Sequence, residues 1–144
     1  MPGNIKFRWF FLAPIVVALF FVVTSPVSWA GVLEDAEEYV RRNPNDPKGH
    51  LKLGLTYGRL GQHRNALASF KEAIRIKPDD ADAHNNLGWT YKNMGRNEEA
   101  IASYKEALRI DPNYTKARNN LNKLEQKTAG EKLAREQRLL KEER

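Results

Sequence analysis

Two consecutive segments of 34 residues decide the fold: residues 47–80 read PKGHLKLGLTYGRLGQHRNALASFKEAIRIKPDD, and residues 81–114 read ADAHNNLGWTYKNMGRNEEAIASYKEALRIDPNY. When the two segments are aligned without gaps, 15 of the 34 positions are identical. A period of this length is typical of stacked supersecondary units, because one unit cannot bury its apolar face alone. The sequence therefore predicts a solenoid of repeated units.

Each unit carries two runs of apolar and small residues at helical spacing, which predicts two antiparallel helices. A glycine at 61 and 95 suits the left-handed conformation that ends the first helix, and a proline at 78 and 112 ends the second. Small residues let the helices approach closely, while aromatic residues fill the space between pairs. The matched pairs are Leu53 and Leu87, Gly54 and Gly88, and Tyr57 and Tyr91 in the first helix, then Ala66 and Ala100, Phe70 and Tyr104, Ala73 and Ala107, and Ile74 and Leu108 in the second.

The order of these residues resembles the tetratricopeptide-repeat (TPR) family. Its 34-residue unit carries leucine then glycine, tyrosine, alanine, an aromatic residue, alanine and proline at the same offsets. The resemblance covers two full repeats, at 47–80 and 81–114, and implies an all-α, helix-turn-helix solenoid that binds other proteins. One offset departs from the family pattern, since His50 and His84 replace the aromatic residue near the start of the first helix.

The flanks are expected to extend the two repeats by half a unit at each end. Residues 31–46 hold apolar side chains in the register of a second helix and are interpreted as a half-repeat capping helix. Residues 115–128 continue the register of a first helix and are interpreted as a C-terminal capping helix. Residues 129–144 are highly charged and are expected to form a marginal helix or a mobile tail.

The N-terminal 30 residues differ from the rest in composition. Lys6 and Arg8 precede a strongly apolar run without charge, and Ser28 and Ala30 supply the small residues that a signal peptidase accepts. We expect residues 1–30 to be a signal peptide that is cleaved after Ala30. The repeats would then be exported, to the periplasm or another extracytoplasmic space.

The alternative is that residues 1–30 are an uncleaved signal anchor and hold the protein in the membrane. The uncharged stretch runs from Trp9 through Leu33, which is long enough to span a bilayer about 30 Å thick. Because the positively charged end stays inside, the repeats of this single-pass form would also lie outside the cytoplasm.

Charge and cysteine content limit the function classes. The chain has 24 basic residues, and setting aside Lys6 and Arg8 leaves 22 against 18 acidic residues. These charges are interleaved along the helices, which is typical of a solvated surface and not of a nucleic-acid interface. The chain has no cysteine, so it has no disulfide, thiolate metal site or lipid-attachment cysteine.

The residues that could carry catalysis or bind a metal do not form a recognisable site. His50 and His84 lie one repeat apart, and together with His63 they are interpreted as packing histidines. Ser69 and Ser103 occupy the same position of the second helix and are expected to face solvent, far from these histidines. No phosphate-binding loop is present. We therefore expect no enzyme activity, no metal and no cofactor.

In TPR arrays the first helices line a concave face, and here the resemblance implies a peptide groove. The sequence is similar to the repeats of protein O-GlcNAc transferases, in which asparagines at the offset of Asn86 and Asn120 touch a bound peptide's backbone. A carboxamide can donate to C=O and accept from N–H; the alternative is that asparagine is simply common at this offset. The predicted groove residues are Lys52, Leu55, Arg59, Asn85, Asn86, Trp89, Lys92, Asn119, Asn120 and Lys123.

The partner is expected to be another protein, through an extended acidic segment, because the groove residues include several cations. The dicarboxylate clamp of chaperone-binding TPR domains is not carried over, since Leu51 and Leu55 stand where it uses lysine and asparagine. The sequence thus predicts an exported interaction module or assembly scaffold of the cell envelope. The alternative is a membrane-anchored or self-assembling subunit of an envelope complex, with a second copy as partner.

Overall fold

The computed structural model of this protein describes residues 29–142, and this part of the chain is helical with no strand. The all-α class predicted from the repeat is therefore confirmed for the described residues. The helices are α2 (Trp29–Arg42), α3 (Pro47–Arg59), α4 (His63–Ile76), α5 (Ala81–Asn93), α6 (Asn97–Ile110) and α7 (Thr115–Glu142).

The predicted signal peptide or anchor lies almost entirely outside the described residues. Helix α2 begins at Trp29, two residues before the predicted mature N-terminus at Gly31. Between residues 29 and 142, no helix combines the length and the apolar character that crossing a membrane requires. Cleavage after Ala30 and the anchor alternative both stay predictions.

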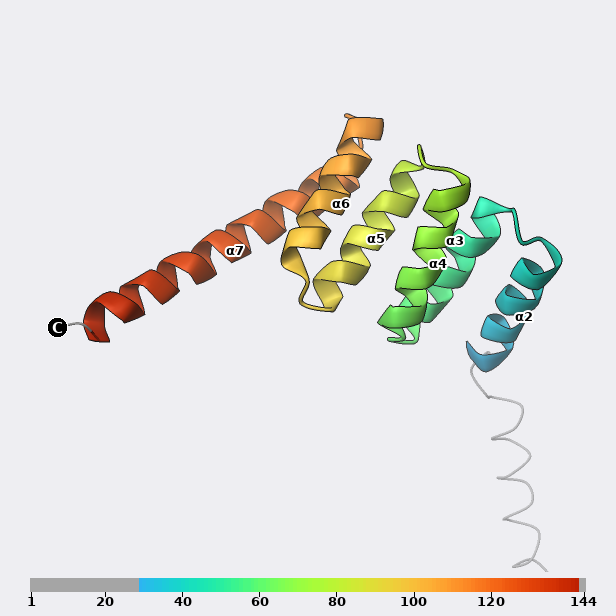
Figure 1. Cartoon of the computed structure of the whole chain (residues 1–144), viewed down its shortest axis with the longest axis horizontal. Helices are drawn as coiled ribbons and strands as arrows, with labels where there is room; N and C mark the ends of the chain where they lie inside the picture. The colour runs from blue at the N-terminus through green and yellow to red at the C-terminus, as the bar shows by residue number, and fades with distance from the viewer. Residues whose placement is uncertain (1–28, 143–144) are drawn as a thin grey trace, which may run out of the picture.

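The helices stack in a single row in chain order (Figure 1). Helices α3 and α4 pair as one hairpin and α5 and α6 as the next, while α4 packs on α5, α6 on α7, and α2 on α3. Contacts also join α3 to α5 and α5 to α7, whereas within the described chain α4 does not contact α6 in this way. The first helices therefore lie closer together than the second helices, which places α3, α5 and α7 on the inner side of the solenoid.

The ends of these helices follow from local residue chemistry. Asp46 and Asp80 are N-caps, and their carboxylates accept hydrogen bonds from backbone N–H groups two and three residues later, at 3.0 Å and 3.1 Å. Gly61 and Gly95 have φ angles of 71° and 75°. Their left-handed backbone ends α3 and α5, as the sequence predicts.

The core lies at the helix crossings that the repeat pattern marks. A Cβ atom on Gly54 would lie 2.6 Å from the Phe70 ring, and one on Gly88 would lie 2.8 Å from the Tyr104 ring. The two glycines thus allow the aromatic rings of the second helices to pack against the first helices. The buried cluster contains Ala66, Phe70, Leu87, Tyr91, Ala100, Tyr104, Leu121 and Leu124.

The two histidines that depart from the family pattern hold the loops between units. His50 donates through Nε2 to the carbonyl oxygen six residues earlier at 2.8 Å, and His84 makes the same bond at 2.9 Å. Arg118, at the equivalent position of α7, also donates to the carbonyl six residues before it. Each accepting carbonyl belongs to the proline of an inter-unit loop, so this position ties the loop to the next first helix.

The expectation that Ser69 and Ser103 face solvent was wrong. Both residues are buried, with 7% and 8% of their surface exposed. Their hydroxyl groups donate to the backbone carbonyls four residues earlier, at 3.0 Å and 2.8 Å. Each second helix packs against a helix on both of its sides, and this covers more of its surface than a single apolar stripe would indicate.

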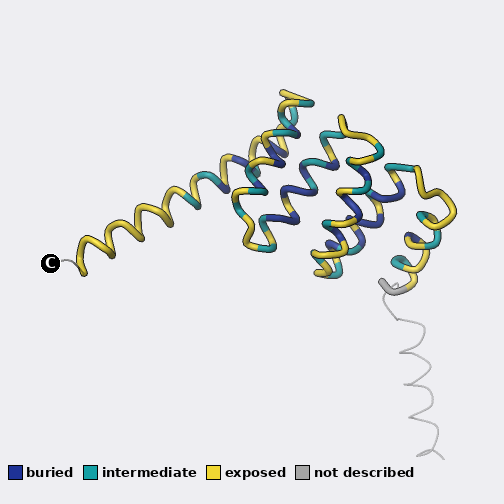
Figure 2. The backbone as a smooth tube through the Cα atoms, in the orientation of Figure 1, coloured by how far each residue is buried: buried dark blue, intermediate teal, exposed yellow. Residues whose placement is uncertain are grey.

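Helix α7 runs without a break from Thr115 to Glu142, so the predicted division after residue 128 is not a helix end. Its first half packs on α6 and buries Ala117, Leu121 and Leu124. Residues 129–142 are exposed throughout and project from the row of helices (Figure 2). The described part of the charged tail is thus a helical overhang.

Candidate functional site on the first helices

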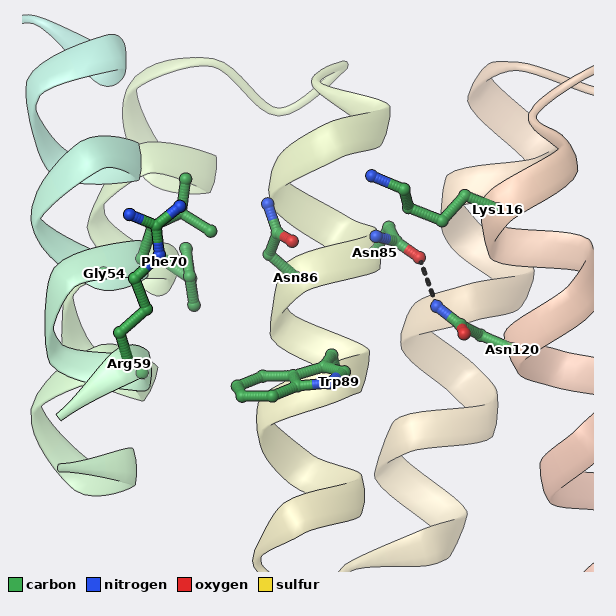
Figure 3. Close-up of a pocket in the computed structure, with 10 residues that line it drawn as sticks. Gly54, Arg59, Phe70, Asn85, Asn86, Trp89, Lys116 and Asn120 are labelled. Carbon is green, nitrogen blue, oxygen red and sulfur yellow. Dashed lines mark hydrogen bonds between the residues drawn. The ribbon is translucent and has the colours of Figure 1, made fainter. Parts of the chain in front are cut away.

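A cavity of about 450 Å³ lies between α3, α5 and α7 on the inner side of the solenoid (Figure 3). Helix α4 contributes one lining residue, Phe70. This volume falls within the range typical of ligand-binding pockets in proteins. The lining residues are Gly54, Leu55, Gly58, Arg59, Phe70, Asn85, Asn86, Trp89, Lys116 and Asn120.

The structure brings six of the ten predicted groove residues to this cavity, namely Leu55, Arg59, Asn85, Asn86, Trp89 and Asn120. The other four, Lys52, Lys92, Asn119 and Lys123, lie on the same three helices outside the lining. Sequence reasoning did not identify Lys116. Its position four residues before Asn120 places both on one face of α7, and this spacing could have revealed it.

The carboxamides of α5 and α7 form a hydrogen bond that the sequence did not predict. Asn120 donates through Nδ2 to Oδ1 of Asn85 at 3.1 Å, and Asn85 is only 2% exposed. The neighbouring Asn86 lines the cavity without a hydrogen-bond partner for its side chain among residues 29–142. The cavity therefore presents one uncommitted carboxamide beside a fixed pair (Figure 3).

The apolar wall of the cavity is built around Trp89, whose side chain lies against α3. A Cβ atom on Gly58 would lie 3.3 Å from Cζ3 of the indole, so the glycine leaves room for the ring to approach the backbone. The His63 ring meets the indole edge to face, with 5.9 Å between centroids. Trp89 is 37% exposed, and Leu55 on the same wall is 40% exposed.

Positive charge predominates along the helices that form the cavity. Helix α3 has three basic residues and no acidic residue, and residues 115–127 have four basic residues and one acidic residue. Arg59 and Lys116 line the cavity from opposite sides (Figure 3).

The carboxylate on α5, Asp82, accepts a hydrogen bond from Tyr114. Burial and this bond raise the pKa of Tyr114 above its ordinary value.

The lining offers binding chemistry: hydrogen-bond donors and acceptors, cations and apolar surface. Among residues 29–142, no three His, Asp or Glu side chains come together as metal ligands. Ser69 and Ser103 are committed to backbone carbonyls on α4 and α6, and neither lines the cavity. The groups that line the cavity are therefore suited to recognition of a ligand.

Two family models match the chain within the described region. One, the tetratricopeptide repeat, matches residues 81–114, and another, the TPR repeat, matches residues 59–95. The chain belongs to the tetratricopeptide-repeat family. This confirms the membership that the 34-residue pattern predicts. TPR proteins are generally protein–protein interaction modules without catalytic activity.

Solved structures of other proteins share this fold. The first TPR of Spaghetti (RPAP3), bound to the HSP90 peptide SRMEEVD, has a TM-score of 0.67 at 22% identity, with 70% of this chain and 80% of that chain covered. MamA has a TM-score of 0.65 at 22% identity, with 67% of this chain and 57% of the MamA chain covered. A thermophilic TPR protein of Thermus thermophilus has a TM-score of 0.62 at 31% identity, with 67% of this chain and 49% of the Thermus chain covered. This chain therefore spans about half of the Thermus protein. No curated protein sequence matches the chain.

Proposed function

We propose that this TPR protein is an adaptor or scaffold that holds an extended, acidic segment of another protein in the groove of α3, α5 and α7. The observation that carries the proposal is the cavity itself. Carboxamides, cations and exposed apolar side chains converge there on the inner face of an interaction fold. These are the groups that a peptide segment requires for backbone, charge and side-chain contacts.

The carboxamides suit the backbone of an extended peptide. Such a peptide presents N–H and C=O groups, and a carboxamide can pair with both. Asn86 has its side chain available at the cavity, whereas Asn120 uses its Nδ2 to hold the buried Asn85. We therefore assign the principal backbone contact to Asn86, with the Asn85 and Asn120 pair fixing the shape of the groove beside it.

The charge of the groove favours an acidic ligand. Arg59 and Lys116 reach the cavity, and Lys52, Lys92 and Lys123 lie on the same helices around it. A complementary negative segment would associate faster and in a defined register. The RPAP3 domain, which has the same fold, is bound to a peptide that carries two glutamates and an aspartate. That complex is a precedent for an acidic segment bound on this fold; because the clamp residues are not carried over, this chain would hold its segment through Arg59 and Lys116.

The proposal places the repeats outside the cytoplasm. Its support is the sequence of residues 1–30, with a short basic start, an apolar run and small residues at 28 and 30. The partner is then expected among proteins of the cell envelope.

The groove can be tested with a photo-crosslinking amino acid in the full-length chain. We expect benzoylphenylalanine at Leu55 to capture an acidic segment of one partner, to be identified by mass spectrometry. The matched control places the same residue at Ala68, which is exposed on α4 and outside the cavity. Capture of the partner from position 68 and not from position 55 would place the interface on the outer face and end the proposal.

Calorimetry with the captured segment then tests the backbone contact. Asn86→Ala should weaken binding by about 1–3 kcal/mol, the range for an interface polar group left unpaired, with little change in stability. Asn119→Ala is the matched control, because Asn119 is exposed outside the lining. Asn120→Ala should also lower stability, since it leaves the buried Asn85 carbonyl without its partner. If the Asn86→Ala and Asn119→Ala variants bind the segment with equal affinity, Asn86 does not make the backbone contact.

A further inference from the structure

One part of the cavity is apolar and open to a ligand. Leu55 and Trp89 are large hydrophobic side chains that line it, and they are 40% and 37% exposed. Gly58 also lines the cavity and is buried beneath the indole of Trp89. We name Leu55, Gly58 and Trp89 the apolar seat.

The indole in this seat is held in place before any ligand arrives. Its Cζ3 atom would be 3.3 Å from a Cβ on Gly58, and the His63 ring supports it at 5.9 Å and an interplanar angle of 70°. An aromatic side chain that is already ordered loses little conformational freedom when it binds. The Trp89 indole is therefore preorganised to contact a ligand.

The repeat does not require this arrangement. One repeat further along the chain, Lys92 occupies the position of Gly58, and Lys123 occupies the position of Trp89. The complete seat thus occurs at the junction of α3 with α5, and cations replace two of its three residues at the junction of α5 with α7, where Trp89 itself stands at the position of Leu55. Because the fold is the same at both junctions, the difference is specific to the groove surface.

We propose that the apolar seat recognises one large apolar side chain, such as leucine, methionine or phenylalanine, within the acidic segment. This inference rests on the proposed function and specifies the residue type that the groove selects. Figure 3 shows Trp89 between Arg59 on one side and Asn120 with Lys116 on the other. Acidic residues on both sides of the seated side chain would then reach these two cations. A central aromatic contact surrounded by polar groups is typical of the residues that dominate binding energy.

The seat can be tested by selecting ligands from a random heptapeptide library displayed on phage, with the full-length protein as bait. We expect the selected peptides to be acidic and to share one large apolar residue at a fixed position. Changing that residue to alanine in the best synthetic peptide should weaken binding to the wild-type protein by at least about tenfold, measured by fluorescence anisotropy. The same change should have little effect on binding to Trp89→Ala, because the two groups contact each other.

Two variants control for nonspecific effects. Trp89→Leu keeps an apolar surface and should retain part of the discrimination that Trp89→Ala loses. Leu139→Ala removes an exposed leucine from the overhang of α7, outside the cavity, and should bind as wild type. Circular dichroism of each variant verifies that the helices are intact.

The outcomes separate the seat from the groove. Two results would overturn the seat and leave the proposed function standing. One is a set of selected peptides that are acidic but share no apolar position. The other is an unchanged affinity of Trp89→Ala for the peptide while Lys116→Glu loses binding. A library that returns no acidic peptides would overturn both.

Discussion

At the residue scale, the tightest contacts between paired helices lie at one glycine of each repeat. The ring of Phe70 covers Gly54, and the ring of Tyr104 covers Gly88. A Cβ on Gly88 would also lie 3.1 Å from the backbone carbonyl oxygen of Ala100, which cannot move as a flexible side chain can. The crossing therefore has room only for hydrogen at this position.

Gly88→Leu should consequently destabilise the protein more than an ordinary overpacking substitution, which costs about 1–3 kcal/mol. Ser103→Ala is the control, because it removes a hydroxyl that bonds only to a backbone carbonyl of its own helix. We expect that control to stay within about 1 kcal/mol of wild type. Urea denaturation followed by circular dichroism measures both, and a Gly88→Leu protein as stable as wild type would show that the crossing is looser than described.

Tyr104 is the second residue with a clear prediction. It is fully buried, and its hydroxyl has no hydrogen-bond partner among the described residues. Phe70 fills the same position in the first repeat. Tyr104→Phe removes an unsatisfied polar group at nearly constant shape, so the free energy of unfolding should stay the same or rise, by about 1 kcal/mol. A loss of more than that in urea denaturation would indicate that the hydroxyl has a partner.

The same substitution should change the response to alkaline pH. Burial raises the pKa of Tyr104 to about 12, from an ordinary value near 10. The unfolded chain therefore releases this proton first, and stability should fall as pH rises from about 10 toward 12. Tyr104→Phe should make that decline shallower, which denaturation at pH 8 and pH 11 can measure.

At the element scale, the two halves of α7 differ in burial. Its first half completes the core with Leu121 and Leu124, whereas residues 129–142 are exposed on all sides. A single helix in water gains little from propensity alone, so the overhang contributes length to the molecule and little to its folding.

Truncation after Thr128 should therefore leave the free energy of unfolding within about 0.5 kcal/mol of wild type. A matched pair of substitutions makes the same comparison inside the full chain. Leu124→Ala, at a position 2% exposed, should cost about 2–5 kcal/mol. Leu140→Ala, at a position 62% exposed, should cost almost nothing. If truncation and Leu124→Ala cost the same in urea, the overhang packs on the body of the protein.

At the scale of the whole molecule, the row of helices brings two cations, Arg59 and Lys116, and two exposed apolar residues, Leu55 and Trp89, to one cavity on its inner face. Whether that face lies outside the cytoplasm depends on residues 1–30. We predict that the mature chain begins at Gly31, because Ser28 and Ala30 supply the small residues needed for cleavage.

Mass spectrometry of the N-terminus from purified membranes and soluble fractions tests this prediction. Ala30→Arg should block cleavage and leave the longer form in the membrane fraction. A wild-type chain that retains its N-terminal segment would instead support the signal anchor.

The 34-residue period was sufficient to predict the helices, their order and their closest crossings. The roles of Gly61 and Gly95 at helix ends, and of Gly54 and Gly88 at crossings, could be predicted because they depend on contacts within one unit. The repetition of the unit then predicted the stacking, since each unit must cover the apolar face of its neighbour.

Only the tertiary structure decided how successive units meet. The bond from Asn120 to Asn85, the approach of Trp89 to Gly58, and the place of Lys116 at the cavity depend on the rotation between neighbouring first helices. A sequence pattern assigns a residue to a helix face, but adjacent residues differ by about 100° around the axis. The choice between Asn85 and Asn86 as the partner of Asn120 therefore required the angle at which α5 and α7 pack, and no spacing within the chain determines that angle.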